Sequence, residues 1–223
     1  VRRRGGLAGG VPTRAGVGAT LRIGTPSAIL GVGFAAIYVL ITPSVAAFGT
    51  AQLAAMAIGH RCESVVYLAS VGYAAATQAL VGQSLGAGDP PRARRIAVRA
   101  CLHGGAWALA CSLALALSGA TFAGFFSDDG EVIAAGATYL GIVSLSLAPQ
   151  TVEQVLTGAF EGAGDTLPPL LVGAVAHGAR LPLVLLATGP LGLGVEAIWA
   201  TIAGCSVLAG VVLAGIFAVR RWR

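Results

Sequence analysis

One eight-residue pattern occurs twice in this chain, and each copy ends a long apolar segment and precedes another. The first copy runs Gly82-Gln-Ser-Leu-Gly86-Ala-Gly88-Asp89, and the second runs Gly158-Ala-Phe-Glu-Gly162-Ala-Gly164-Asp165. Glycine suits the left-handed residue that ends a helix, and Asp can cap the helix that follows. Prolines follow both copies, and proline is tolerated in a first helical turn. The repeat therefore predicts two helical hairpins built in the same way.

The apolar segments around these turns are long enough to cross a membrane. Hydrophobic residues make up 56% of the chain and charged residues 10%, whereas a soluble domain has about 25% charged residues. Crossing the hydrocarbon takes about 20 mostly apolar residues. Six segments qualify: 21–44, 51–84, 92–119, 131–160, 167–188 and 193–219. They lack the period-two alternation of strands, so we expect an all-α bundle of six transmembrane helices over 21–223, after a basic, flexible lead-in at 1–20.

The positions of the arginines predict how this bundle is oriented. The chain has arginines before the first segment, between the second and third, and at the C-terminus: Arg2, Arg3, Arg4, Arg14, Arg22; Arg92, Arg94, Arg95, Arg99; Arg220, Arg221 and Arg223. The other connections carry none. The positive-inside rule assigns the arginine-rich side to the cytoplasm. We expect a multi-pass protein of the plasma (inner) membrane with both termini cytoplasmic. We attribute its +5 net charge to this orientation in the lipid bilayer and not to nucleic-acid binding.

Segment 51–84 carries a polar stripe. Its members are His60, Glu63, Tyr67, Ser70 and Thr77, with Gln78 beside the last. Their spacing keeps them near one face of a helix. An ionisable side chain at mid-membrane costs about 2.5–3.5 kcal/mol on insertion scales, so it marks a function or a paired site. Such a stripe is expected to face the bundle interior or a water-filled cavity.

Two further segments carry polar residues inside the membrane. Segment 131–160 has Gln150, Glu153, Gln154 and Thr157 at helical spacing, and segment 167–188 has His177 and Arg180 three residues apart. Arg180 needs a carboxylate or carbonyl partner, and Glu63 and Glu153 are available for an ion pair. Arg61 lies two residues from Glu63 and points away from it, so Arg61 must pair on another helix or reach an interface.

Two interpretations of Glu63 and Glu153 stay open. They are either halves of structural ion pairs or a site for a cation or proton, which buried carboxylates suit because burial disfavours their charged form. The three histidines are individually expected to pack or to form hydrogen bonds. The four cysteines lack metal-ligand spacing, and no nucleophile and base are arranged as in a hydrolase. We therefore expect neither an enzyme nor a metal site, and no cofactor beyond a bound cation or proton.

Several of these runs resemble one known family. They are Arg61-Cys-Glu63-Ser-Val-Val-Tyr67, both octets, Arg92-Ala-Arg94-Arg95 and Arg180-Leu-Pro182-Leu. They resemble the multidrug and toxic compound extrusion (MATE) transporters, and the resemblance extends through nearly all of the chain. It implies two six-helix halves, related by pseudo-symmetry, that open a central cavity to alternate sides. The chain resembles the second, C-terminal half alone.

The resemblance also implies a function and a site. Such transporters exchange organic cations for Na⁺ or H⁺. Many members carry Glu about where Leu30 stands and some carry Asp about where Gln150 stands, so coupling would depend on Glu63, on Glu153 or on an acid in the missing half. We therefore expect secondary multidrug efflux, with both of these carboxylates binding or relaying the coupling cation. The residues expected to line the cavity are Gln150, Tyr67, Gln78 and Tyr38.

The expected partners are the bilayer, small cationic amphipathic substrates, and a missing N-terminal half or a second chain. Two alternatives remain. A flippase of the same wider superfamily would move a lipid-linked anionic precursor and would need a basic cavity, for which Arg61 and Arg180 are the available cations. The other alternative is a non-transporting fragment or assembly subunit.

Overall fold

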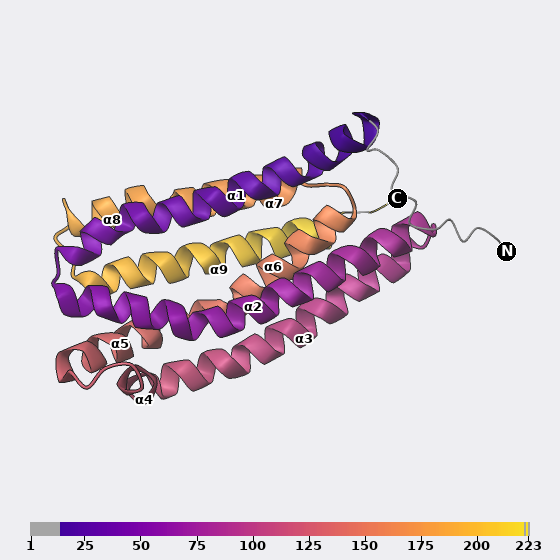
Figure 1. Cartoon of the computed structure of the whole chain (residues 1–223). Coiled ribbons are helices and arrows are strands. Elements are labelled where there is room, and N and C mark those ends of the chain that lie inside the picture. The colour runs from indigo at the N-terminus through magenta and orange to yellow at the C-terminus, as the bar shows by residue number, and fades with distance from the viewer. Residues whose placement is uncertain (1–13, 221, 223) are drawn as a thin grey trace.

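Long helices lying side by side make up the described part of the chain (Figure 1). The computed structural model describes residues 14–220 and 222, although the side chains at 14–23, 26, 27 and 30 lie outside what it describes. The elements are α1 (Arg14–Ala46), α2 (Thr50–Gly86), α3 (Pro90–Leu117), α4 (Gly119–Gly124), α5 (Gly130–Val143), a 3₁₀ turn (Ser144–Ser146), α6 (Leu147–Gly162), α7 (Leu167–Gly178), α8 (Arg180–Thr188) and α9 (Val195–Val219). No strand occurs among these residues, so the expected all-α class is confirmed.

The apolar helices match the predicted membrane spans. Five helical segments are long and apolar enough to cross a bilayer: Thr50–Gly86, Pro90–Leu117, Gly130–Gly162, Leu167–Thr188 and Val195–Val219. The remaining predicted span, 21–44, lies within α1, whose described apolar part is Gly31–Ala46. Because α1 begins at Arg14, residues 14–20 belong to a helix and not to the predicted lead-in. The rest of that lead-in, 1–13, lies outside the described residues.

Both octets form the same backbone turn. Gly88 has a φ of 75° and Gly164 a φ of 73°, which is the left-handed conformation that glycine adopts without a steric penalty. The amide nitrogen of Asp89 donates to the carbonyl of Ser84 at 2.9 Å, and the amide of Asp165 makes the equivalent bond at 2.9 Å. These bonds define the Schellman ending of a helix, so the predicted pair of matching hairpin turns is confirmed.

The aspartates that end the two octets have different roles. The carboxylate of Asp89 accepts from the amide of Arg92 at 2.9 Å and so caps α3, as expected. The expectation is wrong for Asp165, because Thr166 stands between it and the first residue of α7. Asp165 instead forms an ion pair with Arg220 at 2.7 Å, which ties the α6–α7 turn to the end of α9.

Glycines of the octets also let α2 and α6 cross at very short range. A Cβ atom on Gly158 would overlap the backbone of Ala74, and one on Gly162 would overlap the backbone of Gln78. A Cβ atom on Gly82 would lie 3.2 Å from the carbonyl oxygen of Gly162. Small residues allow such backbone approach between membrane helices. The repeat therefore builds a helix crossing as well as two turns.

Two of the spans are interrupted near their middles. The 3₁₀ turn Ser144–Ser146 separates α5 from α6, and Ala179 separates α7 from α8. Pro182 lies three residues after Ala179, in the first turn of α8. Proline has no N–H, so the carbonyl four residues earlier, at Gly178, loses its helical partner. Interrupted membrane helices often border binding sites, and the cavity described below lies beside both breaks.

The two ends of the bundle differ in charge. The start of α1, the end of α9, and the α2–α3 and α6–α7 turns all lie at one end (Figure 1). The arginines of the first turns of α3 and the one that follows α9 gather there: Arg92, Arg94, Arg95, Arg99 and Arg220. Acidic residues Asp128, Asp129 and Glu131 lie in and after the α4–α5 connection at the other end. The arrangement has the one-sided arginines that the sequence predicts, while its orientation in a membrane stays a prediction.

Candidate functional site

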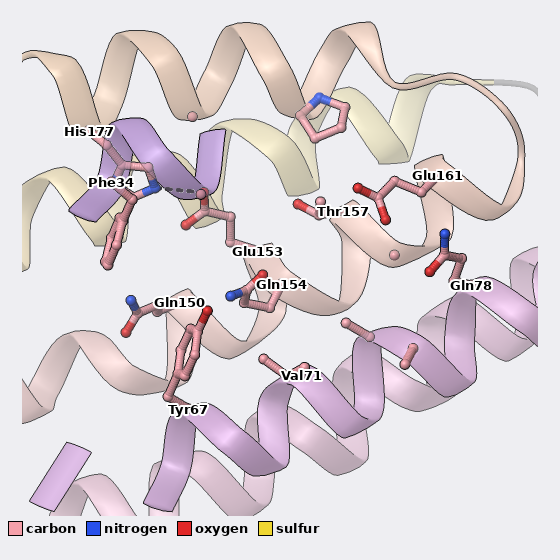
Figure 2. Close-up of a pocket in the computed structure, with 16 residues that line it drawn as sticks. Phe34, Tyr67, Val71, Gln78, Gln150, Glu153, Gln154, Thr157, Glu161 and His177 are labelled. Carbon is pink, nitrogen blue, oxygen red and sulfur yellow. Dashed lines mark hydrogen bonds and ion pairs between the residues drawn. The ribbon is translucent and has the colours of Figure 1, made fainter. Parts of the chain in front are cut away.

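A cavity of about 340 Å³ lies between α1, α2, α6 and α7. Figure 2 shows α6 supplying most of its polar side chains, with α2 facing them across the space. The polar and ionisable residues that line it are Tyr67, Gln78, Gln150, Glu153, Gln154, Thr157, Glu161 and His177. This volume falls within the range of about 300–1,000 Å³ that is usual for small-molecule sites.

The structure places four of the predicted cavity residues on this wall and two elsewhere. Glu153, Gln150, Tyr67 and Gln78 line it. Tyr38 and Glu63 do not belong to its lining; they lie in a separate cluster of polar side chains. The side chain of Leu30, where the resemblance would place a coupling acid, lies outside the described residues.

The carboxylate of Glu153 is paired with an imidazole in the cavity. Nε2 of His177 on α7 lies 3.0 Å from Oε1 of Glu153 on α6, as the dashed line in Figure 2 shows. The two side chains are 13% and 12% exposed. The Phe34 and His177 rings pack perpendicular to each other, with 5.3 Å between centroids. The pair is therefore held by three helices and still reaches the cavity.

Arg180 lies at the centre of the second cluster and is fully buried. Its Nη2 donates to Oγ of Ser206 at 2.6 Å, and its Nη1 donates to the hydroxyl of Tyr38 at 3.4 Å. The guanidinium carbon lies 5.2 Å from the centre of the Phe34 ring and 5.6 Å from that of Tyr38. Hydroxyls and ring faces thus take the place of the predicted ion-pair partner, since no carboxylate lies within 4.0 Å of Arg180 among the described residues.

Glu63 borders this second cluster. Its Oε1 is buried, and Tyr139 and Arg180 lie close enough to influence its charge. Neither Oε1 nor the hydroxyl of Tyr139 makes a hydrogen bond of standard geometry within the described part of the chain. The Tyr139 ring packs on Gly59, one turn of α2 before Glu63, and against Trp199 on α9. Tyr139 therefore lies beside Glu63, and Trp199 packs against the Tyr139 ring.

Arg61 points out of the bundle. It is exposed, and its guanidinium carbon lies 5.9 Å from the centre of the Phe126 ring. Arg61 thus points away from Glu63, as predicted. Its partner on another segment is the aromatic ring of Phe126. The predicted ion pair is not present among the described residues.

His177 is the main site residue whose pairing the sequence did not reveal. The spacing of Gln150, Glu153, Gln154 and Thr157 located the cavity face of α6. No spacing rule joins Glu153 to His177, because they lie on different helices and their contact depends on how α6 and α7 pack. The contact between Arg180 and Ser206 was not predictable for the same reason, because it depends on how α8 and α9 pack.

Comparison with known proteins identifies the family. The MatE family model matches residues 26–186. The chain belongs to the MatE family. It is 30% identical, over 98% of its own length, to the probable multidrug resistance protein NorM of Deinococcus radiodurans, and covers 50% of that protein. It is 27% identical, over 78% of its length, to human multidrug and toxin extrusion protein 1, of which it covers 31%.

Solved structures share the fold of this MatE chain. A crystal structure of MATE in the straight conformation superposes with a TM-score of 0.86 at 17% identity, covering 94% of this chain and 47% of the other. A eukaryotic MATE transporter superposes with a TM-score of 0.82 at 21% identity, covering 93% and 47%. The chain thus spans about half, or less, of the relatives it matches. The resemblance to a MATE-type half is confirmed at the level of family and fold.

Proposed function

We propose that this MatE chain forms half of a secondary transporter that exports organic cations and other xenobiotics in exchange for Na⁺ or H⁺ by alternating access. The observation that carries the proposal is the polar cavity between α1, α2, α6 and α7, which lies within a bundle of membrane-length helices. Several relatives bear multidrug resistance or multidrug extrusion names, which supports the same class of cargo.

The charge of the cavity favours a cationic cargo. Glu153 and Glu161 are on its wall, and no arginine is among its described lining residues. Phe34 and Tyr67 offer ring surfaces, and aromatic faces attract organic cations. A flippase for an anionic precursor would need the opposite polarity. Arg180 lies behind Phe34 and Tyr38, and Arg61 faces outward. We therefore prefer the exporter to the flippase.

We assign different parts to the two carboxylates. Glu153 supplies the negative charge that the cargo meets in the cavity. Glu63, which lies outside the cavity beside Tyr139 in this conformation, is the second coupling carboxylate and becomes accessible when the halves change their arrangement. If the cargo and the coupling ion compete for the same site, binding of one displaces the other. This competition is sufficient for exchange.

The whole transporter requires a second half. The chain spans about half of its relatives, and we propose that an N-terminal half or a second chain completes the cavity wall. The arginine-rich end of the bundle then lies in the cytoplasm, in accordance with the positive-inside rule, with both termini on that side of the plasma membrane. A non-transporting assembly subunit is the remaining alternative.

The decisive experiment is ethidium export from cells that lack their own efflux pumps. The chain is expressed together with a candidate six-helix partner half, either fused to it or as a separate chain. Export that depends on both halves, and that falls when Glu153→Gln is introduced, supports the proposal. If the pair of halves is inserted in the membrane but moves no ethidium, while a lipid-linked precursor is flipped, the exporter function is wrong.

A further inference from the structure

The geometry of the Glu153–His177 pair bears on the identity of the coupling ion. This step depends on the proposed function, because it concerns the same cavity. Oε1 of Glu153 lies 3.0 Å from Nε2 of His177. An ionised carboxylate only accepts hydrogen bonds, so Nε2 must carry a hydrogen and donate it. The remaining ring nitrogen, Nδ1, is buried and has no hydrogen-bond partner among the described residues. It is the nitrogen of His177 left to take up an additional proton.

Protonation of this imidazole would change the charge that a cargo meets. With neutral His177, the pair carries one negative charge and attracts an organic cation. With protonated His177, the pair is neutral overall, because the imidazolium replaces the cargo as the counter-ion of Glu153. Both side chains are only about one-eighth exposed, so water screens this exchange less than it would at a surface. Cargo and proton therefore exclude each other without any proton on Glu153 itself.

We infer that His177 is the residue that takes up the coupling proton, and that it competes with the organic cation for the carboxylate of Glu153. Histidine is suited to this exchange because it changes charge between about pH 5 and 8. The coupling ion at this cavity is accordingly H⁺, and the exchange is one proton for one monovalent cation.

The surroundings of His177 leave Glu153 as its direct ionic partner. The structure places the His177 ring against Glu153 on α6 and Phe34 on α1, and the other ionisable residues that line the same cavity are Tyr67 on α2 and Glu161 on α6. Arg180 is directed to Ser206 and Tyr38. Figure 2 shows Glu161 at the opposite end of the cavity from His177. Glu153 is the acid within ion-pair distance of the imidazole among the described residues.

The test is binding of tetraphenylphosphonium to the full chain in lipid nanodiscs from pH 5.5 to pH 8. For the unaltered chain we expect the dissociation constant to fall about tenfold or more as pH rises, since one linked proton changes affinity up to tenfold per pH unit across the titration range of histidine. Calorimetry in buffers of different ionisation enthalpy should show the release of up to one proton per bound cation toward the acidic end of this pH range.

Three variants separate this inference from its rivals. His177→Gln can still donate to Glu153 and has no proton to exchange, so we expect tight binding that does not change with pH. Glu153→Gln should bind weakly at every pH. Asp128→Asn, which removes an exposed acid from the α4–α5 connection, should retain the pH dependence of the unaltered chain. Replacing choline by Na⁺ at constant ionic strength should change nothing.

Each alternative outcome has a defined meaning. If His177→Gln keeps the pH dependence, or Asp128→Asn loses it, the pH dependence does not arise at His177 and the inference is overturned. Competition by Na⁺ at constant pH overturns it as well. In each of these cases tetraphenylphosphonium still binds, so the proposed cation site stands. If neither the unaltered chain nor any variant binds the probe, this half has no cation site. Both the inference and the proposed binding role of this cavity are then wrong.

Discussion

Glu153 and Glu63 are two acids buried in one membrane bundle, and their surroundings differ in kind. Glu153 lies on the wall of a cavity and is paired with a group that can change its charge. Glu63 lies beside Tyr139 and near an arginine whose charge does not change, because guanidinium stays protonated in proteins. The comparison teaches that burial alone does not define a transport site. Access and an exchangeable partner decide which carboxylate can meet a cargo.

The largest expected difference is in chemical access. In a background where the four native cysteines are replaced by serine, we expect Glu153→Cys to react with a trimethylammonium methanethiosulfonate at least about 100-fold faster than Glu63→Cys. The reagent carries a charge, which is costly to bring into a packed apolar region, and each 1.4 kcal/mol or so of that cost slows the reaction tenfold. Leu191→Cys, at an exposed connection, gives the upper limit. Equal rates at positions 153 and 63 would end the distinction between the two sites.

The next effect concerns the stability of the second cluster. Arg180→Lys should lower the free energy of unfolding in nanodiscs by about 2 kcal/mol, since hydrogen bonds to charged groups contribute about 1.5–3 kcal/mol and lysine cannot reproduce a stacked guanidinium. The matched control is Arg61→Lys, at an exposed position, which should change stability by less than about 0.5 kcal/mol. Similar losses in both variants would show that the buried contacts of Arg180 are not stabilising.

A smaller effect is expected in equilibrium binding. At pH 8, Glu153→Gln should weaken binding of tetraphenylphosphonium about tenfold, corresponding to loss of about 1.4 kcal/mol. Glu63→Gln should stay within about twofold of the unaltered chain, because Glu63 is not on the cavity wall. Equilibrium dialysis measures both. A larger loss in Glu63→Gln than in Glu153→Gln would exchange the roles assigned here.

Tyr38→Phe should have the smallest effect. It removes one long hydrogen bond, 3.4 Å from Nη1 of Arg180, and leaves the ring over the guanidinium. We expect a stability loss of about 0.5 kcal/mol, at the low end for a hydrogen bond, and unchanged cation binding. Thermal unfolding and dialysis on the same preparation provide the two readings. Binding that weakens as much as in Glu153→Gln would mean that the two polar clusters act as one site.

Much of the fold was predictable because it depends on local chemistry. Segment length and apolar content located the spans, and the octets with their prolines located both Schellman turns at Gly88 and Gly164. The sequence could not distinguish the two aspartates. Whether Asp165 caps a helix or binds Arg220 depends on where α9 ends in space, which no local pattern contains.

The site was predictable in part for the same reason. Helical spacing identified the polar face of α6 and placed Tyr67, Gln78 and Glu63 on one stripe of α2. Glu63 lies four residues, about 6 Å along the helix, from Tyr67. That step takes it past the cavity to the level where Tyr139 packs against α2. A polar stripe shows which side of a helix faces the interior. It does not show at which point along the helix a side chain of a neighbouring helix ends the cavity.

The glycine crossing of α2 and α6 has a mechanical consequence. At Gly158 and Gly162 the two backbones touch with no side chains between them. They cannot slide or tilt against each other without collision, so α2 and α6 move as one rigid unit. Any bending of the bundle is then left to its interrupted spans, which are the 3₁₀ turn between α5 and α6 and the break between His177 and Arg180 in the α7–α8 span.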